Sequence, residues 1–154
     1  MGNGINNGMD SAVKFGAGRY RQGRGVLEHC GQEIRRFGKK AYIVSGPRAF
    51  DAVKDRLLPG LTEAGVEFVA EIYDGVCSYE AAEALGKKCL DAGCDEVVGI
   101  GGGVIMDLSK AVAGKAGVGV INIPTSIATC AAFTAMSVMY TPQGAMKDNW
   151  RYEY

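Results

Sequence analysis

The sequence is poor in residues that build metal sites. It contains a single histidine, His29, and its five cysteines form no CxxC pair. A histidine-based metal centre cannot be assembled from it, and the odd number of cysteines argues against a disulfide framework or a zinc site. We interpret His29 as a solvated residue on a helix surface and the cysteines as reduced thiols in a cytoplasmic protein. No metal ligands are therefore expected in this chain.

An excess of either charge is also missing, as is any long apolar run. The 17 basic residues balance 17 acidic ones, so neither a nucleic-acid-binding surface nor an acidic tail is predicted. No apolar stretch reaches the length needed to cross a membrane, and the N-terminus lacks the pattern of a signal peptide. Nucleic acid and membranes are therefore not expected among the partners of this protein.

What is present is a regular alternation of strand and helix patterns. Residues 1–11 are rich in Gly and Asn and predict a flexible tail, which leaves residues 12–154 as one domain. Strands are expected at 12–15, 40–44, 67–72, 97–100 and 119–124. Helices are expected at 25–37, at 49–64, from Ser78 to 91, and after the glycines at 101–103. The second helix should be broken or kinked near Pro59, and Ser78 should cap the third. Residues 135–140 and 146–154, joined by a turn, predict a hairpin. The fold class is α/β, a Rossmann-like parallel sheet with helices on both faces and a C-terminal β-hairpin.

The most informative stretch is residues 96–113. Val97 to Ile100 has the pattern of a buried strand, glycines occupy positions 101–103, and apolar residues then recur at helical spacing. Strand, glycine turn and helix together let the backbone N–H groups of a helix N-terminus face a phosphate, which the missing Cβ atoms allow to approach. The same pattern also occurs as a tight packing turn without a ligand, and both interpretations stay open at this point.

Three segments are expected to meet at one edge of the sheet. Residues 45–48, 101–104 and 124–130 each follow a predicted strand. In parallel sheets, ligands bind beyond the carboxyl ends of the strands. The three segments would therefore line one crevice, which favours nucleotide binding.

The glycine turn is part of a longer motif. Gly-Ile-Gly-Gly-Gly at 99–103, with Asp107 and Lys110 after it, resembles the GGGxxxDxxK signature of the iron-type alcohol dehydrogenase and dehydroquinate synthase superfamily. The block at 124–144 is similar to the PTxxST…SxxSVxYTxxG segment of glycerol dehydrogenases. The two motifs stand in the family's order, cover residues 96–144, and follow a strand–helix rhythm that agrees with the N-terminal half of the family.

This resemblance implies a dinucleotide-binding domain for the NAD(P)-dependent oxidation of a small alcohol or polyol. By position, the glycine turn and the residues just after it would hold the pyrophosphate, the start of the 124–144 block would meet the adenine and ribose, and its later part would lie nearer the nicotinamide. The implied cofactor-binding residues are Gly46, Gly101, Gly102, Gly103, Val104, Ile105, Asp107, Thr125, Ser126, Ala128, Thr134, Met136 and Tyr140. Residue chemistry by itself supports the glycines and hydroxyls, whereas a Met on a buried strand more often fills a core.

The chain departs from the family pattern at three places. Val104 stands where the dehydrogenases often carry Lys or Ser. Gly46 replaces an Asp that would bind the adenine ribose, so the cofactor is NAD or NADP, and Arg48 either pairs with a 2′-phosphate or caps the next helix. Cys130 occupies the position of a substrate-positioning Asp. A thiol cannot replace a carboxylate as an acceptor for substrate hydroxyls, which places glycerol itself in doubt.

In this family the zinc or iron is held by an Asp and two His of a C-terminal helical domain, which is absent from this sequence. One interpretation is therefore the NAD(P)-binding half of a metal-dependent polyol dehydrogenase, inactive alone, which acts as a fragment, in a homo-oligomer or with a separate helical subunit. The alternative is a non-catalytic nucleotide-binding module. A dehydroquinate synthase-like lyase rests on Val104 alone and is disfavoured, because residues 137–140 follow the dehydrogenase block and no Gly-Gly-Lys follows Thr125.

Overall fold

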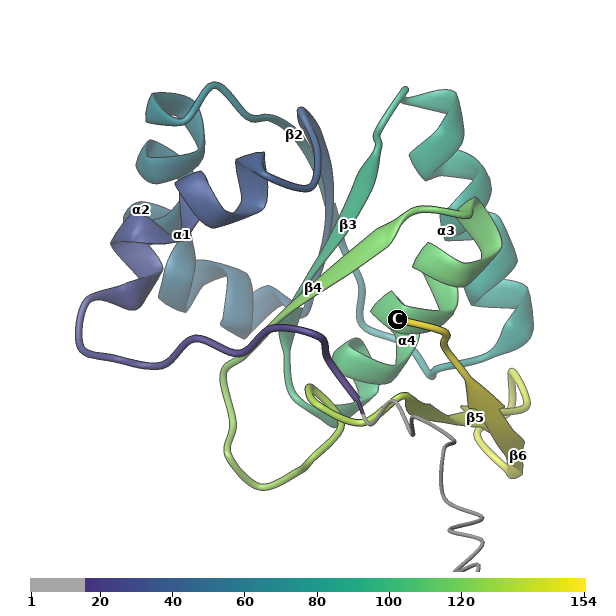
Figure 1. Cartoon of the computed structure of the whole chain (residues 1–154). Coiled ribbons are helices and arrows are strands. Elements are labelled where there is room, and N and C mark those ends of the chain that lie inside the picture. The colour runs from purple at the N-terminus through teal and green to yellow at the C-terminus, as the bar shows by residue number, and fades with distance from the viewer. Residues whose placement is uncertain (1–15) are drawn as a thin grey trace, which may run out of the picture.

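The centre of the molecule is a four-stranded parallel sheet. The computed structural model describes residues 16–154, and its strands β1 (Lys40–Ser45), β2 (Glu67–Ile72), β3 (Glu96–Gly101) and β4 (Gly119–Pro124) lie in the order β2-β1-β3-β4 (Figure 1). The chain therefore runs outward from β1 to β2, crosses back to β3 on the other side of β1, and continues to β4. This reversal creates a switch point between β1 and β3, where open α/β sheets bind ligands.

Helices cover both faces of the sheet. Helices α1 (Val26–Arg35) and α2 (Pro47–Glu63) pack on one face, and α3 (Tyr79–Asp91) and α4 (Gly103–Ala116) pack on the other (Figure 1). Side chains of the central strands alternate between the two layers because successive residues of a strand point to opposite faces. In β1, Ile43 joins the core under α1 and α2, whereas Tyr42 and Val44 join the core under α3 and α4.

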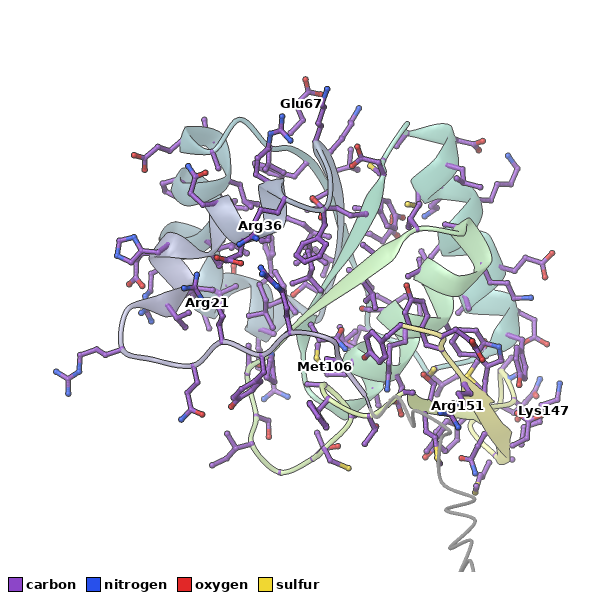
Figure 2. All side chains as sticks on the ribbon, viewed as in Figure 1. Arg21, Arg36, Glu67, Met106, Lys147 and Arg151 are labelled. Atoms are coloured by element: carbon purple, nitrogen blue, oxygen red, sulfur yellow. The ribbon has the colours of Figure 1, made fainter. Side chains whose placement is uncertain are left out.

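Local signals explain several helix ends. The Ser78 hydroxyl accepts a hydrogen bond from Ala81 N–H at 3.1 Å and caps α3, as the sequence predicted. Helix α4 ends at Gly117, which adopts the left-handed conformation with φ of 69° that favours glycine. Figure 2 shows the expected division of side chains, with the exposed Arg21, Glu67 and Lys147 pointing outward and the buried Met106 inside the fold.

Of the two alternatives predicted near Pro59, a break and a kink, the break is wrong. Helix α2 continues through Pro59 to Glu63. A proline inside a helix costs about 3 kcal/mol, but Leu57 and Leu61 on either side are both fully buried and each contributes roughly 1.5–3 kcal/mol. Packing of this helix against the sheet therefore outweighs the lost backbone hydrogen bond.

The C-terminal hairpin forms a separate antiparallel pair, β5 (Met136–Tyr140) and β6 (Met146–Arg151). The predicted second strand at 146–154 ends earlier, at Arg151. The hairpin is tied to the α3–α4 side of the molecule, because Tyr140 N–H donates to the Cys77 carbonyl at 2.8 Å and the Tyr152 hydroxyl donates to the Val118 carbonyl at 2.9 Å. The aromatic side chain of Tyr152, just beyond β6, therefore packs against this chain itself.

The predicted fold class is confirmed: a Rossmann-like parallel sheet with helices on both faces and a C-terminal hairpin. The proposed tail at 1–11 and the proposed strand at 12–15 lie outside the described residues. Within residues 16–154, no helix combines the length and apolar character that a membrane crossing requires. The five cysteines all lie in this range, and each is a free thiol.

Candidate functional site

The carboxyl ends of β1 and β3 lie side by side at the switch point. The Ser45 hydroxyl, fully buried at the end of β1, donates to the Ile100 carbonyl of β3 at 3.0 Å. This bond joins the two strands at the point where their following helices diverge to opposite faces. The first residues of α2 and α4 consequently border the same edge of the sheet.

The glycine turn presents unpartnered backbone donors at this edge. Gly102 is the N-cap of α4, with φ of −91° and ψ of −167°, and the first helical hydrogen bond runs from Met106 N–H to the Gly102 carbonyl at 3.0 Å. The amides of Gly103, Val104 and Ile105 precede that bond, and none of them donates to an acceptor in residues 16–154. They form the positive end of a helix dipole, which suits an anion.

Steric contacts separate the roles of the glycines. A Cβ on Gly99 would lie 2.3 Å from the Ser109 hydroxyl, and a Cβ on Gly101 would lie 2.9 Å from the Ile105 Cβ, so close packing of α4 against β3 requires glycine at both positions. A Cβ on Gly102 would meet nothing within 4 Å. Packing alone therefore does not explain Gly102, whose Cβ direction opens into free space beside the unpartnered amides.

Gly46 borders the same space from the neighbouring strand. It precedes Pro47 at the start of α2, and a Cβ on it would have Ile105 Cγ1 as its nearest neighbour, at 3.9 Å. Arg48, two residues after Gly46, is exposed. No carboxylate stands at residues 46–48, so this edge carries a positive charge where the family pattern has an acidic residue.

The segment after β4 runs along this edge as an exposed loop. Thr125 N–H donates to the Gly101 carbonyl at 2.9 Å, which fixes the start of the loop to the glycine turn. The following residues are exposed, including the predicted cofactor residues Ser126 and Ala128 and the predicted substrate-side Cys130. Gly103 lies near the loop, since its Cβ would be 3.5 Å from Thr129.

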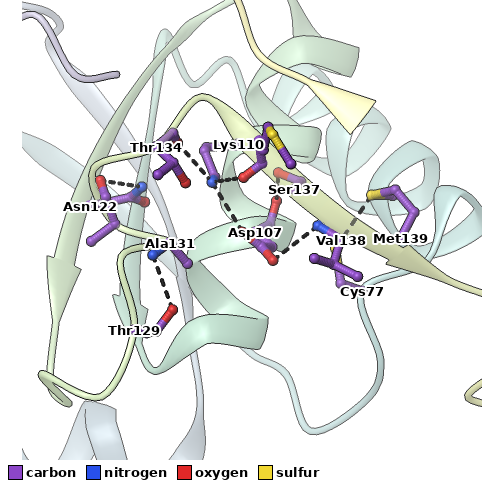
Figure 3. Close-up of polar contacts among 12 residues, drawn as sticks. Cys77, Asp107, Lys110, Asn122, Thr129, Ala131, Thr134, Ser137, Val138 and Met139 are labelled. Carbon is purple, nitrogen blue, oxygen red and sulfur yellow. Dashed lines mark hydrogen bonds and ion pairs between the residues drawn. The ribbon is translucent and has the colours of Figure 1, made fainter. Parts of the chain in front are cut away.

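Asp107 and Lys110 form a buried ion pair under the end of this loop (Figure 3). Asp107 Oδ1 lies 3.0 Å from Lys110 Nζ, and Asp107 Oδ2 accepts a hydrogen bond from Val138 N–H at 3.1 Å. Lys110 Nζ also donates to the carbonyls of Thr134, at 2.9 Å, and Met136. Burial lowers the pKa of Lys110, and the Asp107 charge acts against that shift.

The structure thus divides the predicted site residues into two groups. Those from Gly46, the 101–105 turn and Thr125 meet at the switch point, whereas Thr134 and Met136 lie at the contact between α4 and β5. Tyr140 lies at the far end of β5, where its N–H bonds to Cys77. The sequence analysis did not assign a function to Lys110. Its place in the glycine-rich motif, three residues after Asp107, was the available signal.

Metal-binding groups do not gather at this edge. Across residues 16–154, no three His, Cys, Asp or Glu side chains are placed to share a metal ion. His29 is exposed on α1, on the opposite face of the sheet from α4. The donor groups of the described residues therefore do not fit a catalytic metal.

Comparison with known proteins adds independent information. A family model described as iron-containing alcohol dehydrogenase matches residues 17–153. A glycerol dehydrogenase of Thermotoga maritima is 37% identical over 131 residues, which is 84% of this chain and 35% of that protein. A glycolaldehyde reductase of Halobacterium salinarum is 31% identical over 134 residues, or 87% of this chain and 37% of that protein.

The fold is shared with solved structures. The crystal structure of glycerol dehydrogenase from Schizosaccharomyces pombe superposes with a TM-score of 0.81 at 24% identity, and the match covers 92% of this chain and 36% of that one. At this level of identity the likeness concerns the fold. The chain spans only about 35–37% of the length of these three relatives.

Proposed function

This chain belongs to the iron-containing alcohol dehydrogenase family, and on that premise we propose that it is the NAD(P)-binding half of a metal-dependent dehydrogenase acting on small alcohols or polyols. The observation that carries the proposal is the set of unpartnered amides at Gly103, Val104 and Ile105, beside the open space at Gly102. A pyrophosphate would accept hydrogen bonds there and gain from the helix dipole. The bound nicotinamide would accept the hydride from the substrate carbon.

The remaining cofactor contacts follow from the two groups of residues. Thr125, Ser126 and Ala128 would meet the adenine and ribose side, because Thr125 is hydrogen-bonded directly to the glycine turn. Thr134, Met136 and Tyr140 would lie toward the nicotinamide. Asp107 would act beside them through the backbone it holds, since one of its carboxylate oxygens accepts Val138 N–H and the other pairs with Lys110.

We propose that this edge accepts NADP as well as NAD. The 2′-phosphate of NADP is excluded in related folds by an acidic residue after the neighbouring strand. Here Gly46 leaves that space open, and the exposed Arg48 guanidinium, which makes no ion pair with any described residue, supplies a charge of the right sign.

The substrate is proposed as a small alcohol or polyol, with glycerol itself in doubt. Two relatives that this chain resembles are a glycerol dehydrogenase and a glycolaldehyde reductase. The exposed Cys130 offers no carboxylate for substrate hydroxyls. Metal ligands would come from polypeptide beyond this sequence or from a separate subunit, because the described residues contain no suitable cluster.

One observation favours a second candidate function. Residues 16–154 contain no cluster of metal ligands, which is compatible with a nucleotide-binding module that performs no chemistry. Such a module would bind NAD(H) or NADP(H) at the same glycine turn. Because the chain is expected to be inactive alone, the candidates are separated by assaying it on a panel of diols with zinc or iron after adding the metal-binding remainder of a full-length family relative. Only the dehydrogenase half should then reduce the cofactor.

Cofactor binding is tested by the substitution Gly102→Asp. The new carboxylate would point into the space assigned to the pyrophosphate, and like-charge repulsion is expected to lower the affinity for NADH and NADPH roughly 100-fold. The fold should tolerate the change, because Gly102 has an extended backbone at an N-cap, where Asp is a favoured residue. Calorimetric titration with both cofactors and thermal unfolding measure the two effects.

The matched control is Gly119→Asp. Gly119 begins β4 at the opposite edge of the sheet, and a Cβ there also meets nothing within 4 Å. This variant carries the same added charge and should bind both cofactors like the original chain. Unchanged cofactor affinity in the Gly102 variant would contradict the proposed site.

A further inference from the structure

Lys110 is a fully buried charged residue near the middle of α4. Three oxygens surround its ammonium group: Asp107 Oδ1 at 3.0 Å, the Thr134 carbonyl at 2.9 Å and the Met136 carbonyl (Figure 3). The two carbonyls accept hydrogen bonds from the ammonium group, and the Asp107 carboxylate lies beside it as an ion-pair partner.

A buried ion pair such as this one is weak evidence for a stabilising role in the core. A buried ion pair recovers little net stability after desolvation, and apolar residues of similar volume often replace it without loss. Two of the three oxygens around Lys110 are backbone carbonyls that lie 24 and 26 residues away in the chain. The specific consequence of the contact is the placement of that backbone.

The same turn of α4 also binds Ser137 and Val138, the two residues that follow Met136. The Ser137 hydroxyl donates to the Asp107 carbonyl at 2.9 Å, and Val138 N–H donates to the Asp107 carboxylate at 3.1 Å. At its other end, the exposed loop is tied to the glycine turn through Thr125 N–H and the Gly101 carbonyl. Both ends of the 125–134 loop are thus fastened to one unit made of β3 and α4.

We propose that Lys110 is a positioning residue for the nicotinamide half of the cofactor: it fixes the backbone at Thr134 and Met136 relative to the glycine turn that holds the pyrophosphate. The inference rests on the proposed function. Lys110 would act by holding the end of the 125–134 loop and would not contact the cofactor or the substrate. Removing Lys110 should therefore weaken binding of the nicotinamide part while leaving the adenosine diphosphate part unaffected.

The test compares two variants of the chain. Lys110→Met alone would leave the Asp107 carboxylate buried without its partner, so the informative variant is Asp107→Asn combined with Lys110→Met. Its matched reference is Asp107→Asn alone, which retains the ammonium group and its bonds to both carbonyls. Because this ammonium group then lacks its carboxylate partner, thermal unfolding of both variants is measured to show that each is folded. Lys115→Met, at an exposed lysine of the same helix, controls for loss of a charge.

The readout is the affinity for NADH and for ADP, which lacks the nicotinamide. Relative to Asp107→Asn, the double variant is expected to bind NADH about tenfold more weakly, the size of effect that one lost ordered contact produces. Its affinity for ADP should stay the same. Equal losses for NADH and ADP, or no loss for either, would overturn the proposal, because a purely structural defect does not distinguish the two ligands.

Hydrogen exchange separates failure of this inference from failure of the proposed function. Amides of residues 135–138 should exchange at least about tenfold faster in the double variant than in Asp107→Asn, whereas amides of α3 should be unchanged. Unchanged exchange rates at residues 135–138 would contradict the positioning role, whatever the measured affinities for NADH and ADP. If the unmodified chain binds neither NADH nor ADP, the proposed function fails while the exchange experiment still decides the anchoring.

Discussion

At the scale of single residues, the molecule buries an ion pair and a separate carboxyl group. Lys110 and Asp107 neutralise one another and hold backbone groups of the hairpin. Glu96, at the start of β3, is fully buried, and within residues 16–154 neither of its carboxylate oxygens has a hydrogen-bond partner. Burial, with a smaller contribution from the Asp95 charge, raises the pKa of Glu96 to about 8.

This shift predicts a pH-dependent stability. Between the ordinary pKa of 4.5 and the folded value of about 8, the unfolded chain releases the Glu96 proton while the folded chain retains it. Folding then takes up a proton, so the free energy of unfolding falls as pH rises through this window. The substitution Glu96→Gln should therefore raise the melting temperature by about 4 °C or more at pH 8 and have little effect at pH 5.

The control is Glu63→Gln, at an exposed residue that ends α2. Its effect on melting temperature should be small and the same at both pH values. Thermal unfolding followed by circular dichroism between pH 5 and pH 9 measures both variants. A Glu96 variant whose benefit does not grow with pH would contradict a buried, protonated carboxyl group.

At the scale of secondary structure, α1 and α2 cross closely at two glycines. A Cβ on Gly31 would lie 2.0 Å from the Gly60 carbonyl oxygen, and a Cβ on Gly60 would lie 2.7 Å from the Glu28 carbonyl oxygen. The neighbouring atoms are backbone in both cases and cannot rotate away. Glycine at these two positions therefore sets how closely the helices cross.

The substitution Gly31→Ala should destabilise the fold by about 1–3 kcal/mol, because the two helices must separate to accommodate the methyl group. This loss opposes the gain of roughly 1 kcal/mol that alanine brings to an isolated helix. Urea denaturation measures the net change. Gln32→Ala, at the exposed neighbouring position, is the control. A Gly31 variant as stable as that control would show that the crossing is not tight.

At the scale of the whole molecule, the described residues 16–154 provide unpartnered amides at the switch point but no cluster of metal ligands. The switch-point edge offers donors suited to a dinucleotide, but no group of three metal ligands lies in the part of the chain that the structure covers. Structural and catalytic metal sites of the zinc type need three or four such ligands. Cofactor binding and metal binding are therefore expected to be separable in this protein.

The corresponding prediction concerns metal content. Purified chain loaded with zinc or iron and then dialysed should retain either metal only substoichiometrically, while NADH binding is unaffected by a chelator. Elemental analysis of the dialysed protein, with a calorimetric titration of the same sample, measures both. One tightly bound ion per chain would show that ligands assemble in a way the described residues do not reveal.

Sequence patterns predicted most of the architecture because those signals act over short distances. Strand and helix periods, the Ser78 cap and the glycine turn after β3 depend on residues within a few positions of one another. The alternative of a helix break at Pro59 was wrong, because a local rule competed with burial of Leu57 and Leu61. The second hairpin strand was drawn too long for a similar reason, since a run of residues does not reveal where pairing stops.

The candidate site could be predicted in part. The turn at 101–103 and its neighbours followed from their place after predicted strands and from the family resemblance. The anchoring of the loop by Lys110 could not be predicted, because its carbonyl partners at Thr134 and Met136 are ordinary backbone groups without a sequence signal. The role of a buried lysine as a positioning residue becomes visible only when the tertiary structure shows which segments contact it.

The sequence alone therefore determined the order of strands and helices, the position of the glycine turn and the lack of histidines for a metal site, since each is a property of residue type and local spacing. Tertiary structure decided which glycines are required by packing and which one borders free space, that Lys110 holds the loop end, and that Glu96 is isolated. These depend on contacts between segments distant in the chain, and the distance between two such segments is set by the packing of the whole sheet and its helices.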